Sequence, residues 1–244
     1  MKLVANLVDA ADLTSHERDE MFALMDEHYA NVRRDHFEAD LADKRWVIVV
    51  REPSEDRLCG FSTQTLIEAR IASRPIKALF SGDTIIHRDC WGDSALFHVW
   101  GRLALALIDD YPGDELYWFL ISQGYKTYRL LPLFFHEFYP RFDKLTPSSV
   151  KEVLDGLASA RYPKDYDAET GVIRAKPQQY CLRPGLAEAT RERLRDPHVS
   201  FFYAGNPGHG LGDELCCLAP LTRDNFKPVA YRVIGPEPAL VGMP

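Results

Sequence analysis

The stretch from residue 76 to residue 125 constrains the fold most, because two apolar segments flank one apolar helix. Residues 76–86 (IKALFSGDTII) and 115–122 (ELYWFLIS) have the composition of buried strands, and residues 94–109 that of a buried helix. Between strand and helix lies a polar turn, residues 87–93 (HRDCWGD). The free amides at a helix start can hold an anion, so we expect chemistry at this turn.

Length and charge limit the classes of function. A chain of 244 residues forms one large domain or one domain with a long appendage. The hydrophobic fraction of 46% and charged fraction of 27% are ordinary for a folded protein. The net charge is −7, and the densest basic run, residues 191–195, is interrupted by Glu192. We therefore expect no nucleic-acid partner.

The sequence indicates a cytoplasmic protein without a membrane partner. The first residues lack the basic flank and long apolar run of a signal peptide. The most apolar helix, residues 96–108, contains His98 and Arg102 and is shorter than the ~20 residues that span a bilayer. Five cysteines, without zinc-type spacing, are expected to be reduced thiols.

The first half of the chain predicts a helix followed by a hairpin. Thr14 and Glu17 match a capping box, and apolar residues at helical spacing continue the helix to about residue 33. His28 lies on the apolar face of that helix, where we expect a core histidine. Residues 36–41 form a short helix or turn, and residues 45–51 and 58–68 an antiparallel hairpin. Gly60 within it suggests a bulge or a close approach.

Polar residues interrupt the strand at residues 76–86. Ser81, Gly82 and Asp83 break its apolar character, which predicts a bulge or a functional site. After the second strand, residues 125–139 are rich in aromatic side chains and read as a helix that Pro132 kinks or divides. Those aromatic residues are expected in the core, with a pocket lining as the alternative.

The composition changes after Pro147, and the last hundred residues are harder to assign. We expect a helix at residues 148–160, a long loop at 161–179 and a further helix at 185–195. A strand (199–204), a glycine-rich loop (206–214), a short helix (214–220) and the segment 224–233 follow. The proline-rich tail, residues 235–244, is expected to become ordered only by docking.

The order of these elements resembles the GCN5-related N-acetyltransferase (GNAT) superfamily over about residues 15–140. The most specific parts are the central strand that enters residues 88–95 (RDCWGDSA), and Ile121 and Ser122 followed by Tyr125, Tyr128 and the FYP at 138–140. The resemblance implies an α+β (mixed α/β) fold in which helices flank a central mixed, mostly antiparallel sheet. It implies a core at residues 1–145 and an extension at 146–244 that packs on it and completes the sheet.

The resemblance also implies where an acyl donor binds. In the superfamily, Arg or Gln, two residues, Gly, one residue and then Gly or Ala form the turn whose amides hold the pyrophosphate of acyl-CoA. Arg88 fits the first position, but Trp91 and Asp93 replace the two small residues. This departure leaves room for an acyl-carrier protein as donor instead of CoA. The expected donor-binding residues are Ser81, Gly82, Arg88, Trp91, Gly92 and Ser94.

The superfamily's chemistry suggests roles for further residues. Amides near Ser81, Gly82 and Asp83 would polarise the thioester carbonyl. The base that removes the amine proton would be Glu68, Asp83 or His87, and Tyr128 or Tyr139 would protonate the leaving thiolate. The glycine-rich loop would close over the acceptor through Asn206, His209 and Asp213.

Three alternatives remain beside this interpretation. Cys90 could act as a nucleophile next to His87. A metal could use His198, His209, Asp213 and Glu214, but no standard ligand spacing occurs, so we expect none. The sequence thus favours a GNAT-like N-acyltransferase that acylates the amine of a small molecule or amino acid, with no permanently bound cofactor. A GNAT-like domain that has lost catalysis and binds a ligand or protein is the third alternative, and a homodimer stays open.

Overall fold

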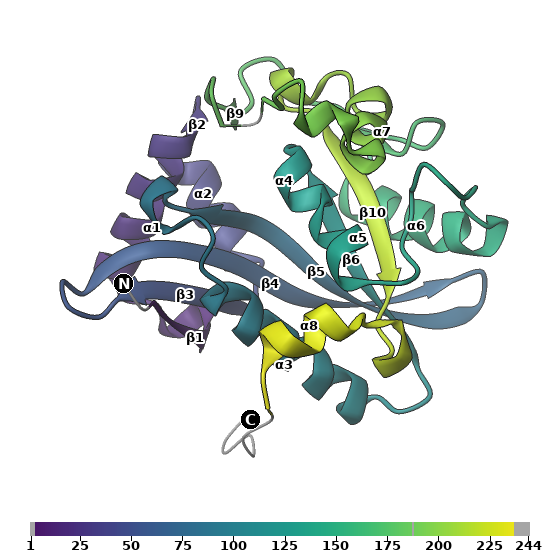
Figure 1. Cartoon of the computed structure of the whole chain (residues 1–244), viewed down its shortest axis with the longest axis horizontal. Helices are drawn as coiled ribbons and strands as arrows, with labels where there is room; N and C mark the ends of the chain where they lie inside the picture. The colour runs from purple at the N-terminus through teal and green to yellow at the C-terminus, as the bar shows by residue number, and fades with distance from the viewer. Residues whose placement is uncertain (1–2, 187, 237–244) are drawn as a thin grey trace.

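The computed structural model describes residues 3–186 and 188–236 and has a mixed eight-stranded sheet at its centre (Figure 1). The strand order is β1-β3-β4-β5-β6-β10-β8-β7. A separate two-stranded pair joins β2 to β9. The strands are β1 (Val4–Asp9), β2 (Tyr29–Ala30), β3 (Trp46–Glu52), β4 (Arg57–Ile71), β5 (Arg74–Ile86), β6 (Glu115–Ser122), β7 (Tyr166–Asp167), β8 (Val172–Ile173), β9 (Cys181–Leu182) and β10 (Glu214–Pro220).

Only one neighbouring pair in the large sheet is parallel. Strands β5 and β6 run in the same direction, and α3 (Ala95–Asp110) connects them. Every other pair in this sheet is antiparallel, including the long β3–β4 and β4–β5 ladders. The expected fold class, a mixed but mostly antiparallel sheet flanked by helices, is confirmed.

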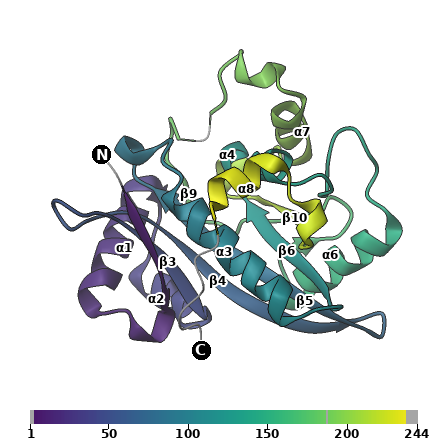
Figure 2. The same ribbon diagram turned by 60° about the horizontal axis from the view of Figure 1, so that its bottom comes forward.

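Helices cover both faces of the sheet. Figure 2 shows α3 and α8 (Pro228–Ile234) together on one face. The opposite face carries α1 (Ser15–His28), α2 (Arg34–Ala42) and α6 (Ser148–Arg161). Alternate residues of β3 enter the two layers, because Ile48 packs with the α3 cluster and Val47 with the α1 cluster. This is why β3 is apolar on both faces, as expected for an interior strand.

The N-terminal expectations hold with two differences. The capping box is confirmed, since Thr14 Oγ1 accepts from the Glu17 amide and Glu17 Oε2 accepts from the Thr14 amide. Helix α1 ends at His28 rather than near residue 33, because Tyr29 is extended and pairs with Leu182 of β9. Residues 4–9, which no pattern assigns to an element, form the edge strand β1 on β3.

The aromatic segment is divided into two short helices, one of the two outcomes expected, although the division is not at Pro132. They are α4 (Tyr125–Tyr128) and α5 (Leu130–Phe134). The break falls at Arg129, and Pro132 lies in the first turn of α5, where its missing N–H costs no hydrogen bond. Residues 135–139 are outside these helices, and Tyr139 forms a bridge with Leu218 of β10.

Three expectations for the C-terminal hundred residues are wrong. Residues 199–204 belong to α7 (Pro197–Gly205), whose start is capped by the Asp196 carboxylate, and not to a strand. Residues 214–220 form β10 between β6 and β8, and not a helix. Residues 185–195 contain only a 3₁₀ turn (Arg193–Arg195) in their described part. Short apolar runs such as Leu215–Ala219 fit a helix and a strand equally well by periodicity.

The long loop expected at 161–179 contains the short strands β7 and β8. The C-terminal segment therefore contributes β10, β8 and β7 to the sheet, while a division of the chain at residue 145 stays a prediction. The end of the expected docking tail, residues 237–244, lies outside the described residues. Within the described part of the chain, the helices are all too short or too polar to cross a membrane.

Candidate functional site

The parallel strands β5 and β6 separate half-way along β5. Their pairing runs from Ile76 opposite Glu115 to Ser81 opposite Leu120 and then stops. Strand β5 continues to Ile86 along β4 only. Here the β4–β5 register shifts, so that Gly82 and Asp83 oppose the single residue Thr63. The irregularity expected at residues 81–83 is present, and it opens a gap in the middle of the sheet.

A buried polar network fixes this irregularity. Ser81 Oγ donates to Gln64 Oε1 (2.6 Å) and accepts from Trp118 Nε1 (2.9 Å). Gln64 Nε2 donates to Ser62 Oγ (2.7 Å), which is 2.6 Å from Thr84 Oγ1. These groups satisfy one another's hydrogen-bonding capacity inside the core, so Ser81 holds β5 in place beside the irregularity.

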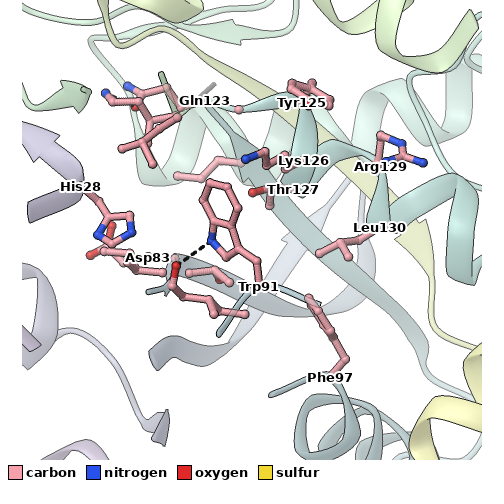
Figure 3. A pocket seen from close by; sticks show the side chains of 18 of the residues that line it. His28, Asp83, Trp91, Phe97, Gln123, Tyr125, Lys126, Thr127, Arg129 and Leu130 are labelled. Atoms are coloured by element: carbon pink, nitrogen blue, oxygen red, sulfur yellow. Dashed lines mark hydrogen bonds between the residues drawn. The ribbon is translucent and has the colours of Figure 1, made fainter. Parts of the chain in front are cut away.

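A cavity of about 650 Å³ lies where the strands separate (Figure 3). Its walls come from the end of β5, the turn before α3, the end of β6 and helix α4. Residues from β2, β9 and the start of β10 also line it. The β2–β9 pair, joined at Tyr29 and Leu182, lies beside this opening and ties α1 to the C-terminal segment.

Trp91 narrows the cavity without filling it. Its Nε1 donates to the Ile86 carbonyl (2.9 Å), the dashed bond in Figure 3. Lys126 Nζ, from α4, lies 3.4 Å from the centre of the Trp91 ring, which is a cation–π contact. The indole is 46% exposed, so one part of it contacts solvent. Together Trp91 and Lys126 bridge β5 and α4 across the cavity mouth.

The turn before α3 uses its own carboxylate at the helix start. Asp93 Oδ1 accepts from the Ala95 amide at 2.7 Å. This hydrogen bond satisfies one of the amides that would otherwise face an anion. Gly92 has a positive φ of 96°, and a Cβ there would meet nothing within 4 Å.

Basic side chains surround the mouth. Lys126, Arg129 and Arg193 line it, and Arg88 is exposed close by. Burial lowers the pKa of Lys126, and the positive charges of Arg88 and Arg193 lower it further. Arg129 has a carboxylate neighbour, with 3.5 Å between its Nε and Asp196 Oδ2. The mouth is therefore electropositive in a chain whose net charge is −7.

Carboxyl groups form a second charged part of the cavity lining, the inner end, which comprises Asp40, Asp83 and Glu214. Burial, with the charge of Asp40, raises the pKa of Asp83 to about 7 against the opposing effect of Lys44. Burial, with the charges of Asp83 and Asp40, raises the pKa of Glu214 to about 8. Asp40 itself pairs with Lys44, whose Nζ lies 2.5 Å from Asp40 Oδ2. Asp83 and Glu214 thus titrate near neutral pH.

Tyrosine rings form the walls around these carboxyl groups. Tyr29 and Tyr180 make an edge-to-face contact with ring centres 5.6 Å apart, and Tyr162 also lines the cavity. Burial raises the pKa of all three phenols well above the usual range, and neighbouring carboxylates raise it further. The three rings therefore stay neutral.

One ring nitrogen of His28 has no hydrogen-bond partner among the described residues. Its Nδ1 donates to the Leu24 carbonyl (2.9 Å), so in the neutral imidazole Nε2 is an acceptor. Nε2 is buried and has no hydrogen-bond partner in the described part of the chain, and His28 lines the cavity. The expectation of a fully satisfied core histidine is wrong for this atom.

Comparisons with known proteins add the following findings. No family model matches the sequence, and no curated protein matches it. A probable N-acyltransferase from Enterococcus faecalis V583 is 15% identical, with a TM-score of 0.40, and the match covers 55% of this chain and 33% of that one. A GCN5-related N-acetyltransferase from Kribbella flavida is 12% identical (TM-score 0.39; 53% and 32% covered). The match spans about a third of the length of these two proteins.

An acyl-CoA N-acyltransferase from Pseudomonas aeruginosa is 12% identical, with a TM-score of 0.39, and the match covers 55% of this chain and 88% of that chain. The elements occur in the order that the resemblance to the GNAT superfamily implies: helix, antiparallel hairpin, central strand, turn with helix, and a parallel strand that separates from the central one. The opening between these two parallel strands, β5 and β6, is the cavity described above.

Of the expected catalytic residues, Asp83 lines the cavity and the others lie outside its lining. Glu68 is 62% exposed and pairs with Lys77 (2.6 Å). His87 lies 3.4 Å from Glu27, outside the lining. Tyr128 donates to the Pro140 carbonyl (3.0 Å) within an aromatic cluster, and Tyr139 donates to Glu137 (2.7 Å).

Some of the expected donor-binding residues line the cavity and others lie outside its lining. Gly82, Trp91, Gly92 and Ser94 line the cavity. Ser81 is buried in the polar network behind it, and Arg88 acts on the mouth through its charge. The alternative role of Cys90 as a nucleophile depends on a thiol that the fold buries. Cys90 is 3% exposed within the α3 core cluster, which leaves its thiol out of reach of a substrate.

The expected acceptor residues stabilise the C-terminal loop instead of lining the cavity. Asn206 Nδ2 donates to the Asp213 carbonyl (2.8 Å), and Asp213 pairs with Arg174 (2.9 Å). His209 packs edge-to-face on Tyr203, with ring centres 4.7 Å apart. Among the described residues, no group of three or more His, Cys, Asp or Glu could hold a metal ion.

Sequence reasoning missed several cavity residues. Tyr29, Lys126, Tyr180 and Glu214 come from segments that are far apart in the sequence. The sequence suggests for Glu214 only a role as a metal ligand, although an acid that directly precedes five apolar residues is a usable signal for a strand-end carboxylate. The pairing of β10 with β6 brings it to the opening.

Proposed function

We propose that this chain is a GNAT-like N-acyltransferase that moves an acyl group from a CoA or carrier-protein thioester to an amine of a small molecule or amino acid. The cavity between the separated strands β5 and β6 carries the proposal. Its electropositive mouth suits a phosphate-bearing donor, and its acidic inner end suits an amine. The thioester would then lie between the two ends.

The mouth favours a donor with a single phosphate near it. Asp93 already accepts from the Ala95 amide, and its negative charge repels a pyrophosphate at the turn. Lys126 and Arg193 offer positive charge slightly away from the turn. The phosphopantetheine arm of a carrier protein has a single phosphate, which could lie there, whereas the diphosphate of CoA would meet the repulsion of Asp93.

The inner part of the cavity supplies the groups that acyl transfer needs. Gly82 and Asp83 lie where the β4–β5 ladder is irregular, so amides near them can donate to a thioester carbonyl. The carboxylate of Asp83 accepts the proton of the attacking ammonium, and its pKa of about 7 suits a base at neutral pH. The neutral amine nitrogen then bonds to the carbonyl carbon and the carbon–sulfur bond breaks. The second proton that the nitrogen loses passes through solvent at the open mouth to the leaving thiolate.

The first test is a thermal-shift series with CoA, acetyl-CoA, a long-chain acyl-CoA and acyl-pantetheine. A ligand at 100 times its Kd stabilises the folded state by about 2.7 kcal/mol. We expect the acylated donors to stabilise the protein, followed by amide formation when an amine is added. No stabilisation by any donor, including an acylated carrier protein, would contradict the proposal.

A binding domain without catalysis is the second candidate. The Asp93 cap and the position of Trp91 favour it, because both occupy the turn that holds the donor in the superfamily that the chain resembles. This candidate predicts that a thioester binds and remains intact when amines are present. Mass spectrometry of the mixture separates the two functions, since only a transferase forms the amide.

A further inference from the structure

Two carboxyl groups face the cavity from opposite sides of the gap. Asp83 belongs to β5, and Glu214 begins β10, which pairs with β6. Both line the cavity, and the charge of Asp83 acts on Glu214. The two carboxyl groups therefore belong to separate walls of one space and can contact the same ligand.

The other charges around this end cancel one another. Asp40 pairs with Lys44, whose side chain is fully buried. Arg161, which lies over the Phe80 ring, pairs with Asp43 (2.7 Å). The nearby rings are the neutral tyrosines described above, together with His28. When Asp83 and Glu214 are both ionised, two negative charges remain without a compensating cation among the described residues.

Unpartnered atoms indicate that this end receives hydrogen-bond donors. Glu214 is 9% exposed, and within the described residues its carboxyl group has no hydrogen bond or ion pair. The second observation is independent of the acids: His28 Nε2 is a buried acceptor without a donor. Buried polar atoms normally have partners, so a ligand with several N–H groups fits this space.

The walls suit an aliphatic cation. The edge-to-face pair of Tyr29 and Tyr180 presents aromatic surface next to the carboxyl groups. Aromatic faces attract ammonium groups and pack against methylene chains. These walls therefore suit a ligand with apolar methylenes between two charged ends.

We propose that the amine acceptor is an aliphatic diamine, with one ammonium group at Asp83 and the other at Glu214. The inference rests on the proposed function, because it identifies the substrate class of the same cavity. The amine at Asp83 loses its proton and is acylated, whereas the amine at Glu214 stays charged and positions the chain. His28 Nε2 accepts one further N–H of the bound diamine.

The test is calorimetric binding of amines to the donor-free protein at pH 8.5. At this pH both carboxyl groups are mostly ionised, since their pKa values are about 7 and about 8. The probes are 1,3-diaminopropane, 1,4-diaminobutane and 1,5-diaminopentane, with butylamine and 4-aminobutyrate for comparison. We expect at least one diamine to bind at least tenfold more tightly than butylamine, and 4-aminobutyrate to bind more weakly still.

Glu214→Gln identifies the second ammonium site. We expect the ratio of the affinities for the diamine and for butylamine to fall to about one in this variant. Glu169→Gln, an exposed change of the same charge, serves as the matched control and should keep the preference. A preserved preference in Glu214→Gln would overturn the assignment. Equal affinities for diamines and butylamine in the unmodified protein would overturn it without any variant.

These results can be separated from a failure of the proposed function. Diamine binding needs no acyl donor, so a protein that binds diamines tightly but no thioester has the cation site without the transferase activity. A protein that binds and transfers the acyl group but shows no preference for diamines retains the proposed function and loses this inference.

Discussion

At the scale of single residues, the surroundings of each carboxyl group decide its protonation. Hydrogen bonds from Arg141 lower the pKa of Asp143 to about 2, and those from Arg174 do the same for Asp167. Asp83 and Glu214 are the opposite case, because burial disfavours their ionised forms. Raised pKa values in a cavity are typical of groups that exchange protons with a substrate.

Asp83→Asn should abolish most transfer activity. Loss of a general base costs about 10²- to 10⁴-fold in kcat, and we expect the KM for the donor to change little. In the unmodified protein, the rate should rise with pH through about 7, where the Asp83 carboxyl group ionises. Steady-state kinetics across pH checks both points, with exposed Asp224→Asn as the control. Unchanged activity in Asp83→Asn would remove this residue from the mechanism.

The double variant Trp91→Gly/Asp93→Gly should bind CoA more tightly. It removes the indole beside the turn, frees the Ala95 amide and deletes a negative charge. Relief of about 1 kcal/mol of repulsion corresponds to roughly a fivefold gain in affinity. Calorimetry with CoA measures the gain, and pantetheine, which has no phosphate, should not share it. Equal or weaker CoA binding by the folded variant would place the diphosphate elsewhere.

At the scale of elements, the sequence patterns predicted those features of the fold that interactions between nearby residues determine. The capping box of α1, the β3–β4 hairpin and the irregularity at Gly82 each depend on residues close in sequence. The identities of α7 and β10 could not be read in this way, since an apolar run of five to seven residues fits both structures. Asp83 is predicted as a site residue because it interrupts an apolar strand in the sequence. Glu214 reaches the site only through the pairing of β10 with β6, which is long-range in sequence.

Gly60→Ala should destabilise the protein by about 1–3 kcal/mol, the usual cost of overpacking. A Cβ at Gly60 would lie 2.7 Å from the Ile85 carbonyl oxygen, so β4 and β5 would have to move apart. This confirms the close approach expected from the sequence. Urea unfolding gives the free energy, with Gly210→Ala as the control, because a Cβ there meets nothing within 4 Å. Equal stabilities of the two variants would contradict this packing.

At the scale of the molecule, the sheet joins two parts of the chain around one cavity. Strands β3 to β6 form the central layer, and β10 extends it from the C-terminal segment (Figure 1). The mouth is electropositive because of α4 and the turn before α3, and the inner end is acidic because of β5 and β10. The polarity of the cavity therefore depends on both parts of the chain.

The buried carboxyl groups should make stability depend on pH. The pKa values of Asp83 and Glu214 are about 7 and about 8 in the folded state and roughly 4 when unfolded. Between pH 4 and pH 8 the folded state binds more protons, so their contribution to the free energy of unfolding decreases as pH rises.

The Asp83→Asn/Glu214→Gln variant lacks this dependence. Its free energy of unfolding should increase relative to the unmodified protein by several kcal/mol between pH 4 and pH 8, at about 1.4 kcal/mol per pKa unit. Urea titrations at a series of pH values measure the difference. A difference that stays constant across this range would show that the two groups titrate normally.

The central claim is that an acyl thioester lies between β5 and β6. A crystal structure with an acyl-pantetheine or acyl-CoA analogue, whose thioester is replaced by an inert ketone, tests it most directly. We predict the ketone oxygen within hydrogen-bond distance of a backbone amide at Gly82 or Asp83, with the phosphate near Lys126. An analogue bound outside this opening, or an empty cavity at saturating concentration, would contradict the account.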